Sequence, residues 1–289
     1  MRLQLDCLPC FLRQVLDASR LTGVSLEVQK ALIKDVLSIL KNFEKFNTPP
    51  ELAREIHNLA KRYVENPDPY KEFKRKSIEM AKSVLNELKA DMTKLNTKEE
   101  RLAFAVKVSG IGNTFDAGVY SIRDFEKLVA SIKNEIKKDF AVWHFNEFLS
   151  ALKEAKKILI VGDNAGETVF DGLLAEELRD YGEVFYGVRG EPIINDATFE
   201  DAVESGLPDV AKVISTGCDF PGVTLKAASP EFKKIFEESD IVISKGQGNY
   251  ESLSEEKKKN LFFLLKVKCP VIASHIGIGV GNYVFLSYT

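Results

Sequence analysis

Three short polar segments, each placed directly after an apolar run, carry the residues of this chain that could do chemistry. The first is Asp163-Asn164, the second contains Asp196, and the third begins at Lys245. A carboxylate beside a carboxamide offers hard oxygen ligands that suit Mg²⁺ or Mn²⁺, and a lysine offers a point charge that suits phosphate. These residue types together indicate a site for a divalent metal ion and a phosphate group.

The apolar runs before these segments have the pattern of buried parallel strands. Residues 158–161 form a continuous run of aliphatic side chains, which is typical of a strand covered on both faces. Open α/β sheets bind ligands at the carboxyl ends of such strands, where the next helix also offers free N–H groups to a phosphate. Because consecutive crossover strands tend to be neighbours, we expect Asp196 to approach Asp163.

Two of these segments also have a purely structural interpretation. Asp196 could simply cap a helix that begins at Ala197, which is a common role for Asp. Gly246 and Gly248 allow close approach of the backbone to a ligand, but they also suit ordinary left-handed turns. Turn chemistry does not explain Lys245, so a phosphate contact is the preferred interpretation of that residue.

Glu167 is our candidate general base for the attacking water. It lies in the first turn of a predicted helix, where a capping acid would also be expected. Asp163 could instead act as a nucleophile, as in aspartyl-phosphate enzymes. The ligand role is preferred because Asn164 beside it supplies a second metal oxygen but no obvious acid for a second step.

Two further polar pairs lie in the part of the chain with helical periodicity. Asn113 and Asp116 interrupt a helix, and they could reach the site across a cleft or cap the next helix. Cys7 and Cys10 form a C-x-x-C at a helix start, but no second C-x-x-C completes a zinc tetrad. Because the other two cysteines stand in different sequence surroundings, a structural or ancillary role is expected for the pair.

The elements that must position these residues divide the chain into two parts. From Leu8 to about Leu152 the periodicity is helical throughout, which predicts an all-helical cap over residues 1–155. After residue 156 strands alternate with helices, which predicts an α/β domain with a mostly parallel sheet over 156–289. The helical part could also wrap the sheet. The predicted strands are Lys157–Val161, Val184–Val188, Ala211–Ser215, Ile241–Ser244, Val271–Ser274 and a last, antiparallel one at Asn282–Ser287.

Composition excludes several classes of function. The 289 residues carry 40 basic and 43 acidic side chains, so a general nucleic-acid surface is not expected. No apolar run is long enough to span a membrane and the N-terminus lacks a signal peptide, so we expect a cytoplasmic protein. The segment GDNAGE matches neither the dinucleotide fingerprint nor the Walker loop.

The ordered motifs, taken together, resemble the metal-dependent damage-control phosphatase family. That family was long a domain of unknown function, number 89, and its fold is also labelled acidic-residue-methyltransferase-like. The likeness runs from Asp6 to the final strand, and the C-x-x-C is similar to that of the archaeal and bacterial subfamily. It is carried by DNAGE from Asp163, INDAT around Asp196, KGQGN from Lys245, GN-x-x-D from Gly112 and the early DC-x-x-C.

This resemblance implies a three-layer α/β/α, Rossmann-like fold and hydrolysis of phosphomonoesters, especially damaged or side-product metabolites. It implies one divalent cation, Mg²⁺ or Mn²⁺ with Co²⁺ and Ni²⁺ as alternatives, at the positions of Asp163, Asn164 and Asp196. A small phosphorylated metabolite is the expected partner, with no nucleic acid and no membrane; the oligomeric state is not implied. The residues assigned to catalysis are Glu167 and Lys245, and those assigned to substrate binding are Asn113, Asp116, Arg189, Lys245 and Asn249.

Two rival functions remain at this point. One is an S-adenosylmethionine-dependent carboxyl methyltransferase, although Arg189 stands at the end of the second strand, where such a cofactor usually requires an acid. The other is a metal-binding module without turnover. Stabilisation by Mn²⁺ without release of phosphate from any ester would favour the second rival.

Overall fold

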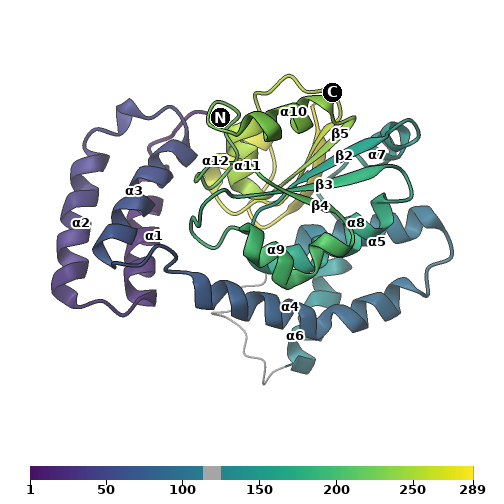
Figure 1. Cartoon of the computed structure of the whole chain (residues 1–289), viewed down its shortest axis with the longest axis horizontal. Helices are drawn as coiled ribbons and strands as arrows, with labels where there is room; N and C mark the ends of the chain where they lie inside the picture. The colour runs from purple at the N-terminus through teal and green to yellow at the C-terminus, as the bar shows by residue number, and fades with distance from the viewer. Residues whose placement is uncertain (113–124, 289) are drawn as a thin grey trace.

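The computed structural model describes the backbone of residues 1–112 and 125–288, and the side chains of 1–112 and 130–288. Within these ranges the chain forms a seven-stranded sheet with helices on both faces and a separate helical bundle beside it (Figure 1). This arrangement confirms the predicted α/β class with a mostly parallel sheet. Asn113 and Asp116, assigned above to substrate binding, lie outside the described residues.

The sheet places the ends of β2 and β5 side by side. Its strand order is β1-β7-β6-β5-β2-β3-β4, and its neighbours are parallel except for the β6/β7 pair, so the predicted antiparallel last strand is confirmed. The chain leaves β2 towards β3 on one side and returns to β5 on the other, which makes the β2/β5 junction the switch point where such sheets bind ligands. The strands are β1 (Val142–Trp143), β2 (Lys157–Val161), β3 (Glu183–Val188), β4 (Lys212–Ser215), β5 (Ile241–Lys245), β6 (Leu261–Lys266) and β7 (Tyr283–Ser287).

Successive side chains of β2 enter two different cores because a strand alternates its faces. Ile158 and Ile160 pack into the larger core, and Leu159 and Val161 pack into the smaller one. The larger core is covered by α4 (Lys71–Met92), α5 (Lys98–Ile111), α6 (Phe125–Ile136), α7 (Phe145–Leu152), α8 (Thr168–Leu178) and α9 (Phe199–Ser205). The smaller core is covered by α10 (Pro230–Glu238), α11 (Gly246–Leu253) and α12 (Pro270–Ile276).

The N-terminal bundle has a core of its own. It consists of α1 (Cys7–Leu21), α2 (Leu26–Leu40) and α3 (Pro49–Tyr63), and Phe11, Leu32 and Ile56 are among its buried side chains. The later helices α4 to α7 pack instead on the sheet, so the packing cores do not divide at residue 155. The domain boundary predicted between residues 155 and 156 concerns parts of the chain that would fold independently, and it stays a prediction. Short 3-10 turns lie at η1 (Phe43–Lys45), η4 (Ala165–Glu167) and η5 (Leu207–Asp209).

Three sequence predictions of secondary structure are wrong. The segment Val271–Ser274, predicted as a strand, is part of α12, where Pro270 occupies a first-turn position that suits its fixed φ. The strand in this region is Leu261–Lys266, a buried apolar run that the periodicity analysis did not separate from helix. The helical periodicity expected as far as Leu152 is also interrupted, because the short strand β1 comes before α7, which begins only at Phe145.

The long charged helix α4 buries one of its charged side chains. Lys74 is only 2% exposed, and its Nζ lies 2.8 Å from carboxylate oxygens of both Asp68 and Asp201. This buried ion cluster joins α4 to the N-terminus of α9. None of the helices that the structure describes combines the length and apolar character needed to span a membrane.

Candidate active site

The loops after β2 and β3 are joined by backbone hydrogen bonds. Ala197 N–H donates to the carbonyl of Asp163 at 2.8 Å, and Ala165 N–H donates to the carbonyl of Asn195 at 2.9 Å. Asn164 and Asp196 form an isolated antiparallel bridge between the loops. The predicted approach of Asp196 to Asp163 is therefore confirmed, although these residues are more than thirty positions apart in the sequence.

Asp196 does not cap a helix. The next helix, α9, begins at Phe199 and is capped by Thr198, whose backbone N–H and hydroxyl both bind the Asp201 carboxylate. This leaves the Asp196 carboxylate to face the site, where it is 4% exposed. The capping interpretation of Asp196 is thus wrong, because Thr198 and Asp201 supply the cap.

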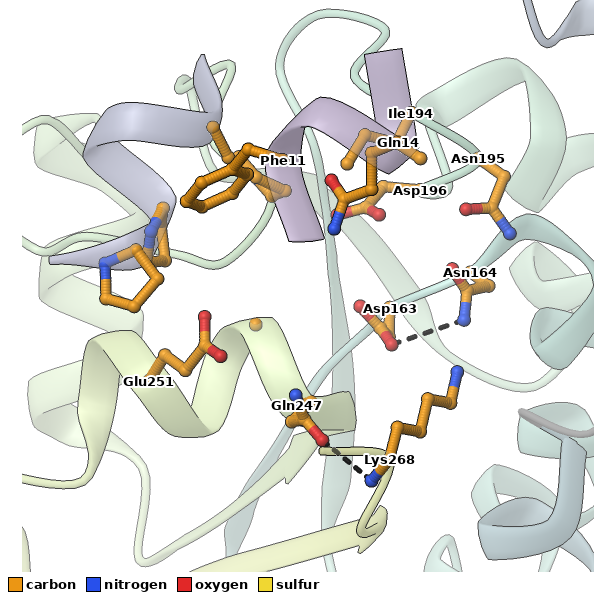
Figure 2. A pocket seen from close by; sticks show the side chains of 15 residues that line it. Phe11, Gln14, Asp163, Asn164, Ile194, Asn195, Asp196, Gln247, Glu251 and Lys268 are labelled. Atoms are coloured by element: carbon orange, nitrogen blue, oxygen red, sulfur yellow. Dashed lines mark hydrogen bonds between the residues drawn. The ribbon is translucent and has the colours of Figure 1, made fainter. Parts of the chain in front are cut away.

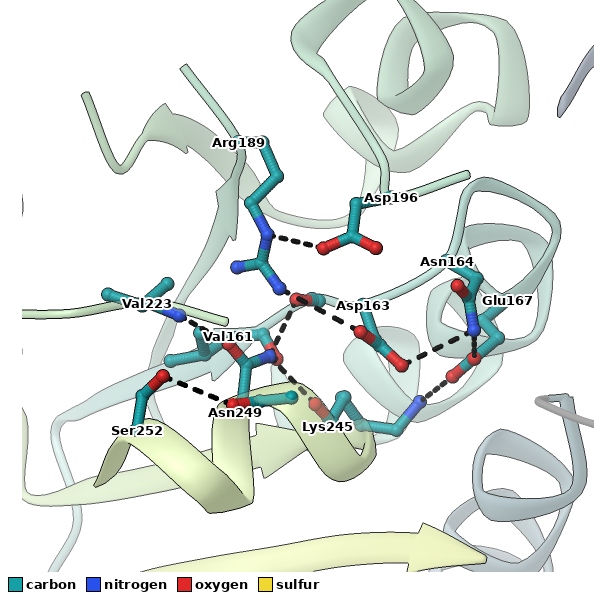
Figure 3. A network of polar contacts seen from close by, with 12 residues as sticks. Val161, Asp163, Asn164, Glu167, Arg189, Asp196, Val223, Lys245, Asn249 and Ser252 are labelled. Carbon is teal, nitrogen blue, oxygen red and sulfur yellow. Dashed lines mark hydrogen bonds and ion pairs between the residues drawn. The ribbon is translucent and has the colours of Figure 1, made fainter. Parts of the chain in front are cut away.

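Arg189 lies between the two aspartates (Figure 3). Its Nε donates to Asp196 at 2.7 Å, and its Nη2 lies 3.7 Å from the Asp163 carboxylate. Burial raises the pKa of Asp163 to about 7, and the charge of Asp196 acts in the same direction. Nη1 and Nη2 of Arg189 are buried and have no hydrogen-bond partner within the described part of the chain. The cluster therefore contains guanidinium N–H groups without acceptors among the described residues and two carboxylates that repel each other, as expected of a ligand-binding site.

A second buried ion cluster lies next to the first and is more completely paired. Lys245 Nζ, fully buried, lies 2.6 Å from Asp171, 3.1 Å from Glu167 and 3.1 Å from the carbonyl of Ser109. Asp171 also accepts hydrogen bonds from the hydroxyls of Ser109 and Tyr186. Lys245 therefore holds two carboxylates in place, and its side chain is not part of either cavity wall described below.

Glu167 links the two clusters. Its Oε1 accepts a hydrogen bond of 2.6 Å from the Asn164 side-chain amide, and its Oε2 faces Lys245. Burial raises the pKa of Glu167 to about 7, whereas the charge of Lys245 lowers it. The side chain makes no capping hydrogen bond to α8, so the helix-cap interpretation is not supported. Its position beside Asn164 leaves the predicted role of general base open.

The backbone conformation at residue 246 depends on glycine. Gly246 has a φ of +75°, and a Cβ at this position would collide with the carboxylate of Asp163. Glycine is the residue that both adopts this φ without strain and allows the close approach. The glycine that follows Lys245 therefore serves both the turn and the site.

The side chain of Asn249 makes its hydrogen bonds to backbone groups. Its amide donates to the carbonyls of Gly162 and Lys245, and its carbonyl accepts from the N–H of Val223. The side chain is fully buried, and it holds three loops together instead of facing a cavity. Its assignment to substrate binding stays a prediction, because all these contacts support a structural role.

Two cavities meet at the ligand loops. The bundle-side cavity, shown in Figure 2, lies between the N-terminal bundle and the ends of β2 and β5. The α4-side cavity lies between α4 and the first turn after β2. Asn164, Asn195 and Lys268 line both cavities, so these residues stand where the two spaces join. The bundle-side cavity is also lined by Phe11, Gln14, Pro49, Pro50, Ala53, Asp163, Ile194, Asp196, Pro221, Gln247, Gly248 and Glu251. The α4-side cavity is also lined by Phe73, Lys74, Ser77, Gly112, Ala165, Gly166 and Glu167.

Lys268 is a candidate functional residue that the sequence analysis missed. Its side chain extends toward Asp163 and Asn164 in Figure 2. The residue follows β6 by two positions, so it occupies the same strand-end location as the residues found from sequence. The signal was present, but it was hidden because the strand Leu261–Lys266 was not identified.

The oxygen atoms near Arg189 suit a hard divalent cation. Asp163 and Asp196 supply carboxylates and Asn164 supplies a carboxamide, and Figure 3 shows the three side chains converging. Among the described residues, no group of three or more His, Cys, Asp and Glu side chains is placed to hold a metal ion. An ion at this position would consequently need the Asn164 oxygen, together with water or substrate.

Comparison with known proteins places this arrangement in context. The family model of the damage-control phosphatase ARMT1-like domain matches residues 3–284. A damage-control phosphatase of Pyrococcus horikoshii is 36% identical, over 98% of this chain and 97% of its own length, and a damage-control phosphatase of Archaeoglobus fulgidus is 31% identical over 96% of each. An uncharacterised protein of Methanocaldococcus jannaschii is 38% identical over 97% of this chain and 94% of its own. The crystal structure of a DUF89 family protein from P. horikoshii superimposes with a TM-score of 0.92, at 34% identity over the full length of both chains.

Proposed function

This chain belongs to the damage-control phosphatase ARMT1-like family, and from that premise we propose that it hydrolyses small phosphomonoester metabolites, damaged or side-product phosphates among them, with the help of a divalent metal ion. Relatives named damage-control phosphatases support a phosphatase role in general. The observation that carries the metal-dependent part is the convergence of Asp163, Asn164 and Asp196 at the β2/β5 switch point beside Lys268.

The donor set fits the proposed cation. Asp163 and Asp196 are buried carboxylates whose mutual charge is only partly balanced by Arg189, so a positive ion between them would be stabilised. Asn164 adds a neutral oxygen, and this combination of ligands suits Mg²⁺ or Mn²⁺, with Co²⁺ and Ni²⁺ as alternatives. A bound divalent ion would supply Lewis-acid polarisation of a phosphoryl oxygen.

Cationic and N–H groups surround the space where a phosphate would lie. Lys268 lines both cavities and supplies a charge that suits phosphate oxygens. Arg189 does not line either cavity; it donates to Asp196 and faces Asp163, so it would help to hold these two carboxylates in place. The first turn after β2 adds the backbone of Ala165 and Gly166 to the cavity wall. Such preorganised donors stabilise charge that grows on the transferring group.

The second ion cluster gives Glu167 a fixed orientation. Lys245 holds one oxygen of Glu167 and the amide of Asn164 holds the other, so the carboxylate cannot rotate freely. Glu167 lines the α4-side cavity, from which it could accept a proton from the attacking water. Lys245 then acts as a positioning residue for Glu167. The direct phosphate contact that was predicted for Lys245 is assigned to Lys268 instead.

The test is phosphate release from a panel of phosphate esters by chelator-treated protein, with and without each of Mg²⁺, Mn²⁺, Co²⁺ and Ni²⁺. Turnover should depend on added metal and should be lost in Asp196→Asn, because one of the charged ligands is removed. Asp209→Asn is the matched control, since this carboxylate is exposed and lies outside the site. Full activity of the metal-free protein, or of Asp196→Asn, would refute the proposed mechanism.

A further inference from the structure

The two cavities meet at the proposed metal ligands but differ in the acidic groups that line them. Glu167, the candidate general base, lines the α4-side cavity, whereas Glu251 lines the bundle-side cavity. A phosphate at their junction would face both spaces. Because the attacking and leaving oxygens of a phosphoryl transfer lie roughly in line, water that attacks from the side of Glu167 drives the leaving group toward the bundle-side cavity.

Glu251 projects from α11 into the bundle-side cavity (Figure 2). It follows Gln247 by one helical turn, so both side chains lie on the face of α11 that lines the cavity. Tyr250 and Leu253, on the other side of this helix, are buried in the smaller core. The packing of α11 therefore holds Glu251 in a fixed position beside the site.

The charge of the bundle-side cavity is mainly negative. Its acidic residues are Asp163, Asp196 and Glu251, and Lys268, at the junction, is the one basic residue in its described lining. Arg189 and the proposed metal ion would balance the two aspartates. Glu251 is therefore the acidic group of this cavity that is left to interact with a part of the ligand other than the phosphate.

The carboxylate of Glu251 has no ion-pair partner among the described residues. The ammonium group of Met1 donates to the main-chain carbonyl of Glu251 at 2.7 Å, and it forms its ion pair, at 3.4 Å, with Glu255. Burial raises the pKa of Glu251 to about 7, because the charged form loses solvation there. A cationic group of a ligand beside this carboxylate would stabilise the charged form.

The remaining wall of the bundle-side cavity suits a short alkyl segment. Phe11, Pro49, Pro50 and Ala53 form its apolar part on the side of the bundle. The cavity has a volume of about 210 Å³. Pockets that hold drug-sized ligands have roughly 300–1,000 Å³. The leaving group that fits is therefore small, with an apolar stem and a polar end.

We propose that the bundle-side cavity receives the leaving group of the ester, and that Glu251 selects leaving alcohols that carry an ammonium group. This inference rests on the proposed phosphatase function and adds the class of substrate, which is the phosphate monoesters of small amino alcohols. Esters whose leaving group carries a carboxylate are disfavoured, because they place like charge beside Glu251. Glu251 is thus a specificity-determining residue.

The reaction itself is a balanced hydrolysis. The oxygen of water bonds to phosphorus, and the bond from phosphorus to the alcohol oxygen breaks. Glu167 accepts one proton from the water, and the alcohol oxygen takes up one proton as it leaves. The products are inorganic phosphate and the free amino alcohol, whose ammonium group is unchanged by the reaction.

The first experiment compares aminobutyl phosphate, butyl phosphate and carboxypropyl phosphate as substrates in the presence of Mn²⁺. At about pH 8 the Glu251 carboxylate is ionised, and a primary ammonium group similar to that of lysine keeps its proton. The unmodified protein should prefer aminobutyl to butyl phosphate by about 10- to 100-fold in kcat/KM, as expected for a hydrogen bond between charged groups. Carboxypropyl phosphate should be the poorest substrate.

Glu251→Gln keeps the size of the side chain and removes its charge. The preference for aminobutyl phosphate should then fall to within about threefold, while kcat/KM for butyl phosphate changes little. Glu256→Gln is the matched control and should keep the full preference, because Glu256 is exposed and lies outside this cavity. A purely structural role of Glu251 predicts equal losses for all three esters. Such equal losses, or a preference that survives in Glu251→Gln, would overturn the proposal.

Binding of phosphonates separates this inference from the proposed phosphatase function. Aminopentyl and pentyl phosphonate carry a methylene group in place of the ester oxygen and cannot be hydrolysed at that bond. Titration calorimetry with Mn²⁺ should show that the unmodified protein binds the aminopentyl compound about 10- to 100-fold more tightly, and that Glu251→Gln does not. If this difference remained but no ester were hydrolysed, the phosphatase proposal would fail and the role of Glu251 would stand. Equal binding of both phosphonates to the unmodified protein would refute the role of Glu251, even in an active phosphatase.

Discussion

The two buried ion clusters beneath the cavities differ in how fully their charges are paired. Around Lys245, the ammonium group has two carboxylates and a carbonyl within hydrogen-bond distance. Around Arg189, a guanidinium faces two carboxylates but keeps two buried nitrogen atoms without a hydrogen-bond partner in the described part of the chain. Completely paired buried charge indicates a scaffold, whereas incompletely paired charge indicates a place for a ligand.

The largest expected effect is on stability, at the fully paired cluster. Lys245→Met should lower the free energy of unfolding by about 3–5 kcal/mol, because Glu167 and Asp171 would remain buried without their cation. Urea denaturation measures it. Lys212→Met, which removes an exposed partner of Glu183, is the control and should cost little. Equal stability of the two variants would remove the distinction between scaffold and ligand cluster.

The next effect separates the clusters by their response to metal. Arg189→Met should destabilise the metal-free protein, since Asp163 and Asp196 would then repel each other without compensation. Mn²⁺ at 100 times its dissociation constant should restore about 2.7 kcal/mol, because it binds the folded state. Thermal melting with and without Mn²⁺ measures this gain. Absence of any gain with Mn²⁺ in Arg189→Met would contradict the assignment of this cluster to a metal ligand.

Replacement of Lys268 tests the role of the cavities through its effect on activity. Lys268→Ala should reduce kcat/KM by about 10- to 100-fold, because the charge proposed to contact the transferring phosphate is removed. Its stability should change by less than about 1 kcal/mol, as expected for a residue that lines a cavity. Lys226→Ala, at an exposed position away from the cavities, is the control for both measurements. A large loss of stability with unchanged kcat/KM would assign Lys268 to the scaffold instead.

The smallest effect probes the edge of the paired cluster. Tyr186→Phe removes the hydroxyl that donates to Asp171 at 2.7 Å, and it should cost about 1.5 kcal/mol of stability. The melting temperature should fall equally with and without Mn²⁺, because Asp171 is not a proposed ligand. A metal-dependent difference would show that the two clusters are coupled more closely than their hydrogen bonds indicate.

The sequence predicted the strand-end positions well, and it predicted side-chain partners poorly. Asp163 and Asp196 were found because strand ends share one edge of a parallel sheet, which is a rule of topology. The partners of Lys245 were not found, because Asp171 lies one helical turn beyond Glu167 and its side chain is buried. Periodicity identifies a buried face but does not distinguish a charged residue that is paired there from one that binds a ligand.

Errors in the C-terminal part had a single physical origin. Leu261–Lys266 and Val271–Ser274 are both short apolar runs, and a buried strand and a buried helix give the same pattern over so few residues. Choosing the second run as the strand hid Lys268, which follows β6 by two positions. Misassigning one element therefore removed a candidate phosphate contact.

The hydrogen bonds that join the loops after β2 and β3 bear on how the protein would respond to a changing supply of metals. The main chain sets the separation of Asp163 and Asp196 through the Ala197 N–H and the bridge at Asn164. Because this spacing is set without an ion, the proposed site would accept one divalent metal in place of another without refolding of the loops. The amide protons of Ala165 and Ala197 should then exchange slowly with solvent at any metal concentration, and the choice of metal would follow its abundance in the cell.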